Sequence, residues 1–173
     1  MLETMIKFTE DREQIISLWS EIFGDSREDI EFFLDNCKNK RCLGYFEKGV
    51  LVSMLFLIDC RYGAYNGQYL YAVCTDENYR KRGIASKLIA EAKRNMKDFL
   101  WLIPAKDHLF AFYGKYGFET KLYSQGTFEN KIEFNENMEI ITEYLYEGSD
   151  YDYPLGMIYS SLELPKGGTG FNV

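Results

Sequence analysis

Histidine, proline and paired cysteines are scarce in this sequence. Its 173 residues include three prolines, one histidine (His108) and four cysteines (Cys37, Cys42, Cys60 and Cys74). No two cysteines form a C-x-x-C pair, so ligand spacing indicates no zinc site, and we expect no metal. Isolated cysteines in apolar surroundings are typical of reduced, buried packing residues, and we expect that role for all four.

Long hydrophobic segments are also lacking. The longest nearly unbroken apolar run, Val50 to Ile58, is far shorter than the ~20 residues that a membrane helix needs. The N-terminus has neither the basic start nor the apolar core of a secretion signal, and Leu2 excludes myristoylation. We therefore expect a cytoplasmic protein with no membrane partner.

Acidic residues outnumber basic ones by 27 to 20, which gives a formal net charge of −7 and a pI near 4.9. This balance argues against a general affinity for nucleic acid. The excess is local, because residues 129–152 hold eight acidic residues and one lysine, Lys131. The stretch also contains alternating apolar and aromatic residues, so we expect it to be folded with its acids on a solvated face.

The hydrophobic spacing predicts helices and strands in a mixed order. Helices are expected over Ile15 to Phe23, where Gly24 supplies a stop, and after Ser26, which can cap a helix with Asp29 three residues on. Three strands then form an antiparallel meander, with Asn66-Gly67 as a hairpin signal. These strands are Arg41 to Phe46, Val50 to Cys60 and Gln68 to Cys74.

The second part of the chain alternates between helices and strands. After Gly83 the spacing predicts a helix of roughly fourteen residues. It is followed by a strand (Phe99 to Ile103), a helix (Asp107 to Lys115), a strand (Phe118 to Tyr123) and, near the end, Met157 to Leu162. Together with a first short strand, Met5 to Phe8, this order predicts an α/β (α+β) fold with a mixed, mainly antiparallel central sheet flanked by helices.

The most informative segment joins the strand that ends at Cys74 to the helix that follows Gly83. An Arg-x-x-Gly-x-Ala pattern, Arg80 to Ala85, opens this helix. Backbone N–H groups converge there at the positive end of the helix dipole, and Gly83 allows an anion to approach closely. Taken alone, the pattern is more typical of a basic surface loop that carries a glycine than of a phosphate site.

A second pattern follows at Tyr113, where a helix runs into Tyr113-Gly114-Lys115-Tyr116-Gly117-Phe118. With Arg80-x-x-Gly83-x-Ala85 upstream, the sequence resembles the GNAT superfamily of N-acetyltransferases. The resemblance covers about residues 5–123. It implies one domain over 1–173, with a cofactor-binding core in 1–123 and an acidic, aromatic part in 124–173 that completes the sheet and the acceptor side.

The resemblance implies acetyl-CoA as the acyl donor and assigns its contacts. The strand end Val73, Cys74 and Thr75 would pair with pantetheine and polarise the thioester carbonyl. The turn would hold the pyrophosphate through Arg80, Lys81, Arg82, Gly83, Ile84, Ala85 and Ser86. Tyr113 would act as the general acid beside the sulfur, and a neutral tyrosine with an ordinary pKa near 10 can donate that proton. The alternative for Tyr113 is a packing aromatic, as for Tyr116.

Two positions depart from the family pattern. Lys106 and Leu109 stand where the family commonly has Asn and Ala, so Lys106 contacts either a CoA phosphate or only solvent. His108 lies in the same turn, and its ordinary role is to begin the helix. The general base is not identified: Asp59, Glu129 and a water chain all remain candidates.

These patterns predict an N-acetyltransferase that moves the acetyl group of acetyl-CoA directly to a primary amine of a small molecule or peptide. The alternatives are a non-catalytic acyl-CoA-binding module with the same fold, or an acidic protein-interaction domain. The acceptor is not fixed by sequence. Aromatics such as Trp19, Phe23, Phe32 and Phe33, with carboxylates nearby, suit a cationic amine, but they are more typical of core packing. A homodimer stays open.

Overall fold

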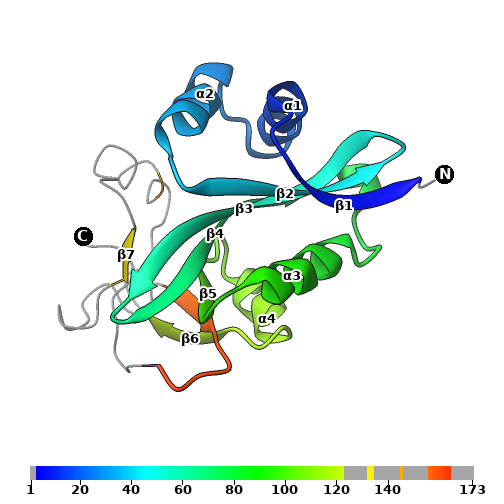
Figure 1. Ribbon diagram of the computed structural model, residues 1–173. Helices are drawn as coiled ribbons and strands as arrows, with labels where there is room; N and C mark the ends of the chain where they lie inside the picture. Colours follow the sequence, from blue (N-terminus) through cyan, green and yellow to red (C-terminus); the bar gives the residue numbers. More distant parts are fainter. Residues whose placement is uncertain (1–2, 123–131, 135–144, 146–155, 165–173) are drawn as a thin grey trace. The chain divides into compact units, whose positions relative to one another are not determined.

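The computed structural model describes residues 3–122, 132–134, 145 and 156–164 (Figure 1). The chain divides into two compact units. Unit 1 is Met1–Ile58 with Leu70–Asn95, and unit 2 is Asp59–Tyr69 with Met96–Val173. Two long strands, β3 (Val50–Tyr62) and β4 (Tyr65–Thr75), contribute residues to both units. The single domain over 1–173 stays a prediction.

The strands of unit 1 follow the order β1-β2-β3-β4. Strand β1 (Thr4–Thr9) pairs antiparallel with β2 (Lys40–Glu47), and β2 pairs antiparallel with β3. These strands agree with the expected meander. Strand β3 is almost wholly buried from Leu51 to Ile58, which explains why its sequence is continuously apolar rather than alternating.

Three helices complete unit 1: α1 (Arg12–Phe23), α2 (Arg27–Asn36) and α3 (Ile84–Asn95). Figure 1 shows α1 and α2 on one face of the unit 1 strands and α3 on the other. The predicted boundary signals are confirmed. Gly24 ends α1 in the left-handed conformation (φ 75°), which glycine adopts at little cost. Ser26 caps α2 by accepting a hydrogen bond from the Asp29 N–H at 3.1 Å.

An aromatic cluster ties α1 and α2 to the sheet. The ring centre of Trp19 lies 5.2 Å from that of Phe33, 5.6 Å from that of Phe56 and 5.7 Å from that of Tyr71. Trp19 is 1% exposed and Phe33 is fully buried. Both residues are therefore core packing residues, which is the second of the two roles that their sequence pattern allows.

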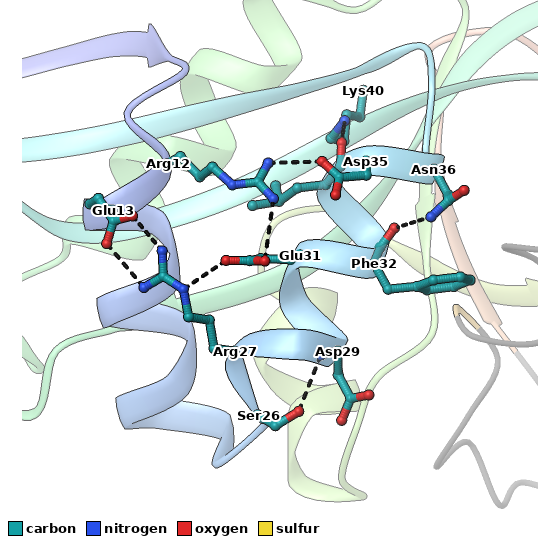
Figure 2. A network of polar contacts seen from close by, with 11 residues as sticks. Arg12, Glu13, Ser26, Arg27, Asp29, Glu31, Phe32, Asp35, Asn36 and Lys40 are labelled. Atoms are coloured by element: carbon teal, nitrogen blue, oxygen red, sulfur yellow. Dashed lines mark hydrogen bonds and ion pairs between the residues drawn. The ribbon is translucent and has the colours of Figure 1, made fainter.

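Ion pairs also connect α1 with α2 (Figure 2). Arg27, at the start of α2, bonds Glu13 of α1 and, at 2.7 Å, Glu31 of its own helix. Arg12 of α1 reaches Asp35 of α2 at 3.0 Å. Because these side chains are largely exposed, each pair contributes little to stability, and the network mainly fixes how the two helices lie side by side.

The hairpin between β3 and β4 differs from the expected one. It turns at Gly63-Ala64, where Gly63 has φ 62°, whereas Asn66-Gly67 lies within β4. The reason is the pairing with β5 (Phe99–Leu102): a Cβ at Gly67 would come within 2.6 Å of the Phe99 ring. Asn66 also exchanges two bonds with Asp98, both of 2.8 Å. Asn66 and Gly67 thus take part in the pairing of β4 with β5 and do not form a turn.

The other strands of unit 2 follow the order β4-β5-β8-β6. Strand β5 runs parallel to β4 over Gly67–Tyr69, while β8 (Gly156–Tyr159) is antiparallel to both β5 and β6 (Glu119–Leu122). Strand β7 (Ile132–Phe134) pairs with the end of β3. The predicted fold class, a mixed and mainly antiparallel sheet with helices, is confirmed.

Some expectations fall on parts of the chain outside this description. Most of the acidic stretch 129–152, including the candidate base Glu129, lies outside the described residues. Glu133 is described, and it is exposed and paired with Arg61 at 3.2 Å. Within the described segments, no helix is long and apolar enough to cross a membrane, and no group of three or more potential metal ligands occurs there.

Candidate functional site

The end of β4 leaves regular strand geometry just before the predicted donor-binding residues. Ala72 has φ 53°, an uncommon value for a residue other than glycine. After it, Val73 and Thr75 are half-buried and Cys74 is buried. The hydroxyl of Ser53 on β3 lies 2.8 Å from the Cys74 carbonyl oxygen and 2.8 Å from Thr75 Oγ1. Sequence reasoning missed Ser53, although it is the only polar residue in its apolar run.

A short 3-10 helix, η1 (Glu77–Tyr79), follows the strand. The Asp76 N–H donates to the Val52 carbonyl at 2.8 Å, which keeps the chain beside β3 for one more residue. Arg80 then folds back, and its Nε donates to the Thr75 carbonyl at 3.1 Å. The strand end and the basic turn are therefore connected directly by the first arginine of the motif.

The turn that leads into α3 places two residues in the left-handed region. Lys81 has φ 63° and Gly83 has φ 72°. A Cβ built on Gly83 would meet no atom within 4 Å, so the backbone faces open space. Gly83 also accepts the first helical hydrogen bond, from the Lys87 N–H at 3.2 Å. Successive N–H groups in such a turn form a concave site for an anion.

The charges around this turn are positive. Arg80, Lys81, Arg82 and Lys87 are exposed, and none of the four forms an ion pair with a carboxylate in the described part of the chain. The Arg82 guanidinium lies 5.0 Å from the ring centre of Tyr79, and the Lys87 ammonium 5.9 Å from that of Tyr45. A pyrophosphate bound at this turn would thus lie near four cationic side chains that no carboxylate of the described residues neutralises.

The first turn of α3 also lacks negative charge. It contains no acidic residue, whereas α1 and α2 each carry carboxylates in their first turns. Ile84 is buried and anchors the helix in the core, while Ala85 and Ser86 are half-buried. The N–H groups of a first turn have no acceptor within the helix, and together with the helix dipole they favour an anion at this point.

The four cysteines are buried, free thiols, as expected. Burial raises the pKa of Cys37 and of Cys74 to about 12 and raises the pKa of Cys42 and Cys60 as well. Cys74 lies in the predicted donor-binding strand, but a thiol with this pKa is not a thiolate at neutral pH. The strand therefore offers no cysteine nucleophile for an acyl-enzyme.

We predict that the folded protein protects all four thiols from alkylation at pH 8, because only the thiolate reacts and each thiol is buried. In denaturant all four should react. Folding raises the pKa values of these thiols above the ordinary value of 9.0. The stability that the protonated thiols contribute to the fold is therefore complete below pH 9 and is lost toward about pH 12. Protection from alkylation should weaken over the same pH range. Mass spectrometry after iodoacetamide treatment measures both, and rapid labelling of the native protein at pH 8 would contradict the prediction.

Tyr113 belongs to unit 2, in helix α4 (His108–Gly114). It is 6% exposed, and its ring centre lies 5.0 Å from that of Phe112 and 5.9 Å from that of Phe118. Its carbonyl accepts the N–H groups of Tyr116 and Phe118, which closes the Tyr-x-x-x-Gly-Phe turn. Burial raises the pKa of Tyr113 to about 12, so the phenol is protonated at neutral pH and can donate a proton.

The residues that depart from the family pattern are at the start of α4. Lys106 and His108 are exposed, and His108 is the first residue of the helix, as expected for a helix-start residue. The alternative base Asp59 is half-buried and accepts a 3.0 Å hydrogen bond from the Gln68 side chain. The structure thus brings the strand end and the basic turn together in unit 1 and describes Tyr113 in unit 2.

Comparison with known families identifies the class of protein. A family model described as an acetyltransferase (GNAT) domain matches residues 7–121, which is more than half of the chain. The chain therefore belongs to the GNAT acetyltransferase family, and the predicted resemblance is confirmed. A search of curated proteins finds no significant match.

Solved structures share the fold at low sequence identity. A GNAT family N-acetyltransferase from Escherichia coli, in complex with CoA, is 12% identical with a TM-score of 0.65, over 99% of this chain and 91% of that one. An acyl-CoA N-acyltransferase from Pseudomonas aeruginosa is 18% identical with a TM-score of 0.58, over 92% and 100%. Arabidopsis thaliana Naa50, in complex with the bisubstrate analogue CoA-Ac-MVNAL, is 17% identical with a TM-score of 0.53, over 68% and 84%.

Other matched proteins are much longer than this chain. It spans 33% of a conserved protein from Enterococcus faecalis and 17% of a fungal multi-domain GH3 β-N-acetylglucosaminidase with a glucosamine N-acetyltransferase region. The shared part is the acetyltransferase fold, so the substrates of these longer proteins do not carry over.

Proposed function

We propose that this protein transfers the acetyl group of acetyl-CoA directly to a primary amine of a small molecule or peptide. The observation that carries the proposal is the turn before α3. Gly83 has a positive φ and faces open space at a helix N-terminus, and the exposed cations around it have no carboxylate partner among the described residues. The positive charge of this turn is complementary to the pyrophosphate of CoA, and the open space at Gly83 lets the pyrophosphate approach the backbone.

In this proposal the donor occupies two parts of unit 1. The turn from Arg80 to Ser86 holds the pyrophosphate, and the backbone of Val73, Cys74 and Thr75 holds pantetheine and polarises the thioester carbonyl. Acetyl-CoA supplies the activated acyl group. The residues of the chain contribute position and hydrogen bonds that strengthen as negative charge develops on the carbonyl oxygen.

The transfer itself is a substitution at the thioester carbonyl carbon. The neutral amine forms the C–N bond, the C–S bond breaks, and the departing sulfur takes a proton from Tyr113. The amine gives up one proton to a base or to water, and Tyr113 regains its proton from solvent. The phenol of Tyr113 is in its donor form at neutral pH, as a tyrosine with an ordinary pKa would also be. The buried thiol of Cys74 supports direct transfer over an acyl-enzyme.

The proposal is tested by following the release of free CoA thiol from acetyl-CoA with a panel of amines, alongside calorimetry with acetyl-CoA alone. Binding and amine-dependent thiol release support it. Binding without release for any amine would favour the non-catalytic acyl-CoA-binding module. The absence of both would overturn the assignment of the donor site and leave the acidic protein-interaction domain.

A cationic acceptor is the class that the charge distribution favours. The net charge of −7 equals the imbalance within residues 129–152, and an excess of one sign steers oppositely charged molecules. We expect kcat/KM for a polyamine or aminoglycoside to exceed that for a neutral amine. The advantage should shrink as ionic strength rises from about 0.01 M to about 0.1 M, which shortens the Debye length from roughly 30 to 10 Å. A rate advantage for acidic or neutral amines would contradict this expectation.

A further inference from the structure

Ser53 is a polar residue where the sequence otherwise places only apolar ones. It lies within Val50–Ile58, on a strand with neighbours on both sides in the order β2-β3-β4, and it is 1% exposed. A buried hydroxyl costs free energy unless its hydrogen-bonding groups are paired. Both of its contacts are with the end of β4, at Cys74 and Thr75.

The direction of these two hydrogen bonds follows from the atoms involved. The Cys74 carbonyl can only accept, so the single hydroxyl hydrogen of Ser53 is donated to it. The second contact, between Ser53 Oγ and Thr75 Oγ1, then has Thr75 as the donor and Ser53 as the acceptor. The hydroxyl of Ser53 thus donates its only hydrogen and accepts one, and it fixes a backbone carbonyl and a side chain at the same strand end.

These contacts decide which backbone groups of the strand end remain available. Along a strand, the N–H and C=O groups of successive residues point alternately to opposite edges. The Cys74 carbonyl is held by Ser53, and the Asp76 N–H by Val52, so both residues present their groups to β3. The backbone groups of Val73 and Thr75 therefore point to the other edge. Of these, the Thr75 carbonyl is bonded by Arg80.

We infer that Ser53 is a positioning residue for the acyl donor, acting through the end of β4. By holding the Cys74 carbonyl and the Thr75 side chain toward β3, it leaves the Val73 N–H, the Val73 carbonyl and the Thr75 N–H as the groups that contact the donor. The inference rests on the proposed function and sharpens it, because it divides the three predicted donor-binding residues into two that contact the donor and one, Cys74, that anchors the strand.

The first test compares Ser53→Ala with Ser160→Ala. Ser160 is a matched control in unit 2, because its hydroxyl also donates to a backbone carbonyl, that of Asp98, at 2.6 Å. With an accepted amine, Ser53→Ala should lower kcat about tenfold, the size of effect expected for one hydrogen bond, whereas CoA affinity, carried by the intact turn at Gly83, should change less than about threefold. An unchanged kcat, or an equal loss in Ser160→Ala, would overturn the inference.

The second test needs no acceptor, because it measures backbone amide hydrogen exchange by NMR. In the wild type, acetyl-CoA should slow exchange at Val73 and Thr75 and leave Asp76, already bonded to Val52, unchanged. In Ser53→Ala this alternation should disappear, with faster exchange at Asp76. Equal protection of Val73, Cys74 and Thr75 by acetyl-CoA in the wild type, or the wild-type pattern retained in Ser53→Ala, would overturn the inference.

A double substitution tests whether Ser53 and Thr75 are coupled. If Ser53 and Thr75 act as one unit, Ser53→Ala combined with Thr75→Val should lower kcat little further than Ser53→Ala alone, and effects that multiply would contradict the link. The proposed function fails separately: a wild-type protein that folds but binds no acetyl-CoA in calorimetry refutes the donor site itself, before any variant is compared.

Discussion

Replacing Gly83 with aspartate is expected to abolish acetyl-CoA binding. Two effects act together. The positive φ of Gly83 strains any residue with a side chain, at about 1–2 kcal/mol. The new carboxylate would also lie next to the pyrophosphate, where two like charges ~4 Å apart repel by about 4 kcal/mol at an effective dielectric constant of 20. The strain lowers the stability of the fold, whereas the repulsion acts on binding and alone predicts a loss of affinity of more than about 100-fold by calorimetry.

Gly49→Asp is the matched control for this experiment. Gly49 has φ 82°, and a Cβ there would likewise meet no atom within 4 Å, but it lies in the turn between β2 and β3. It therefore carries the same backbone strain and the same added charge away from α3. Equal loss of binding in both variants, or unchanged binding in Gly83→Asp, would refute the assignment of the pyrophosphate site.

Replacing Tyr113 with phenylalanine is expected to lower kcat by about 100-fold, at the lower end of the range for general acid catalysis. The change removes the phenol that protonates the sulfur and keeps the ring that packs against Phe112 and Phe118. Calorimetry should therefore show unchanged affinity for CoA. Tyr116→Phe, one turn further along the chain, is the control and should retain the wild-type rate.

The pH dependence of the rate should report groups other than Tyr113. Because burial raises its pKa to about 12, the donor form stays fully populated from pH 7 to pH 9. The rate should therefore not fall over this interval through loss of the tyrosine proton, and any rise should report deprotonation of the amine or of the base. A wild-type rate in Tyr113→Phe would show that Tyr113 is a packing aromatic only.

The fold could be predicted where local signals determine it. The Ser26 cap, the Gly24 stop and the apolar spacing of α1 and α3 depend on neighbours within a turn or two, and the structure confirms each. The prediction of a hairpin at Asn66-Gly67 was wrong because a contact that is distant along the chain determines the structure there. Gly67 is required by the ring of Phe99, 32 residues away along the chain, and no local pattern reports that contact.

In the candidate site, too, features set by neighbouring residues could be predicted, and features set by contacts between distant residues could not. The turn proposed to bind the anion could be singled out from the sequence, since Gly83 and its basic neighbours are adjacent in sequence. The geometry of the strand before it was not, because the left-handed Ala72 and the bonds from Ser53 depend on how β4 lies against β3. One signal for Ser53 was present in the sequence: a single hydroxyl in an unbroken apolar strand must have a buried partner.

The left-handed conformation of Ala72 has a consequence for how the site is maintained. Alanine in this region costs about 1–2 kcal/mol relative to its ordinary conformations, and such strain persists only where the surrounding structure enforces it. The peptide from Leu70 to Leu88 would therefore relax if it were cut out or grafted onto another loop. If this segment binds the donor as proposed, that capacity depends on the assembled sheet of unit 1, and the motif should not be transferable as a stretch of sequence.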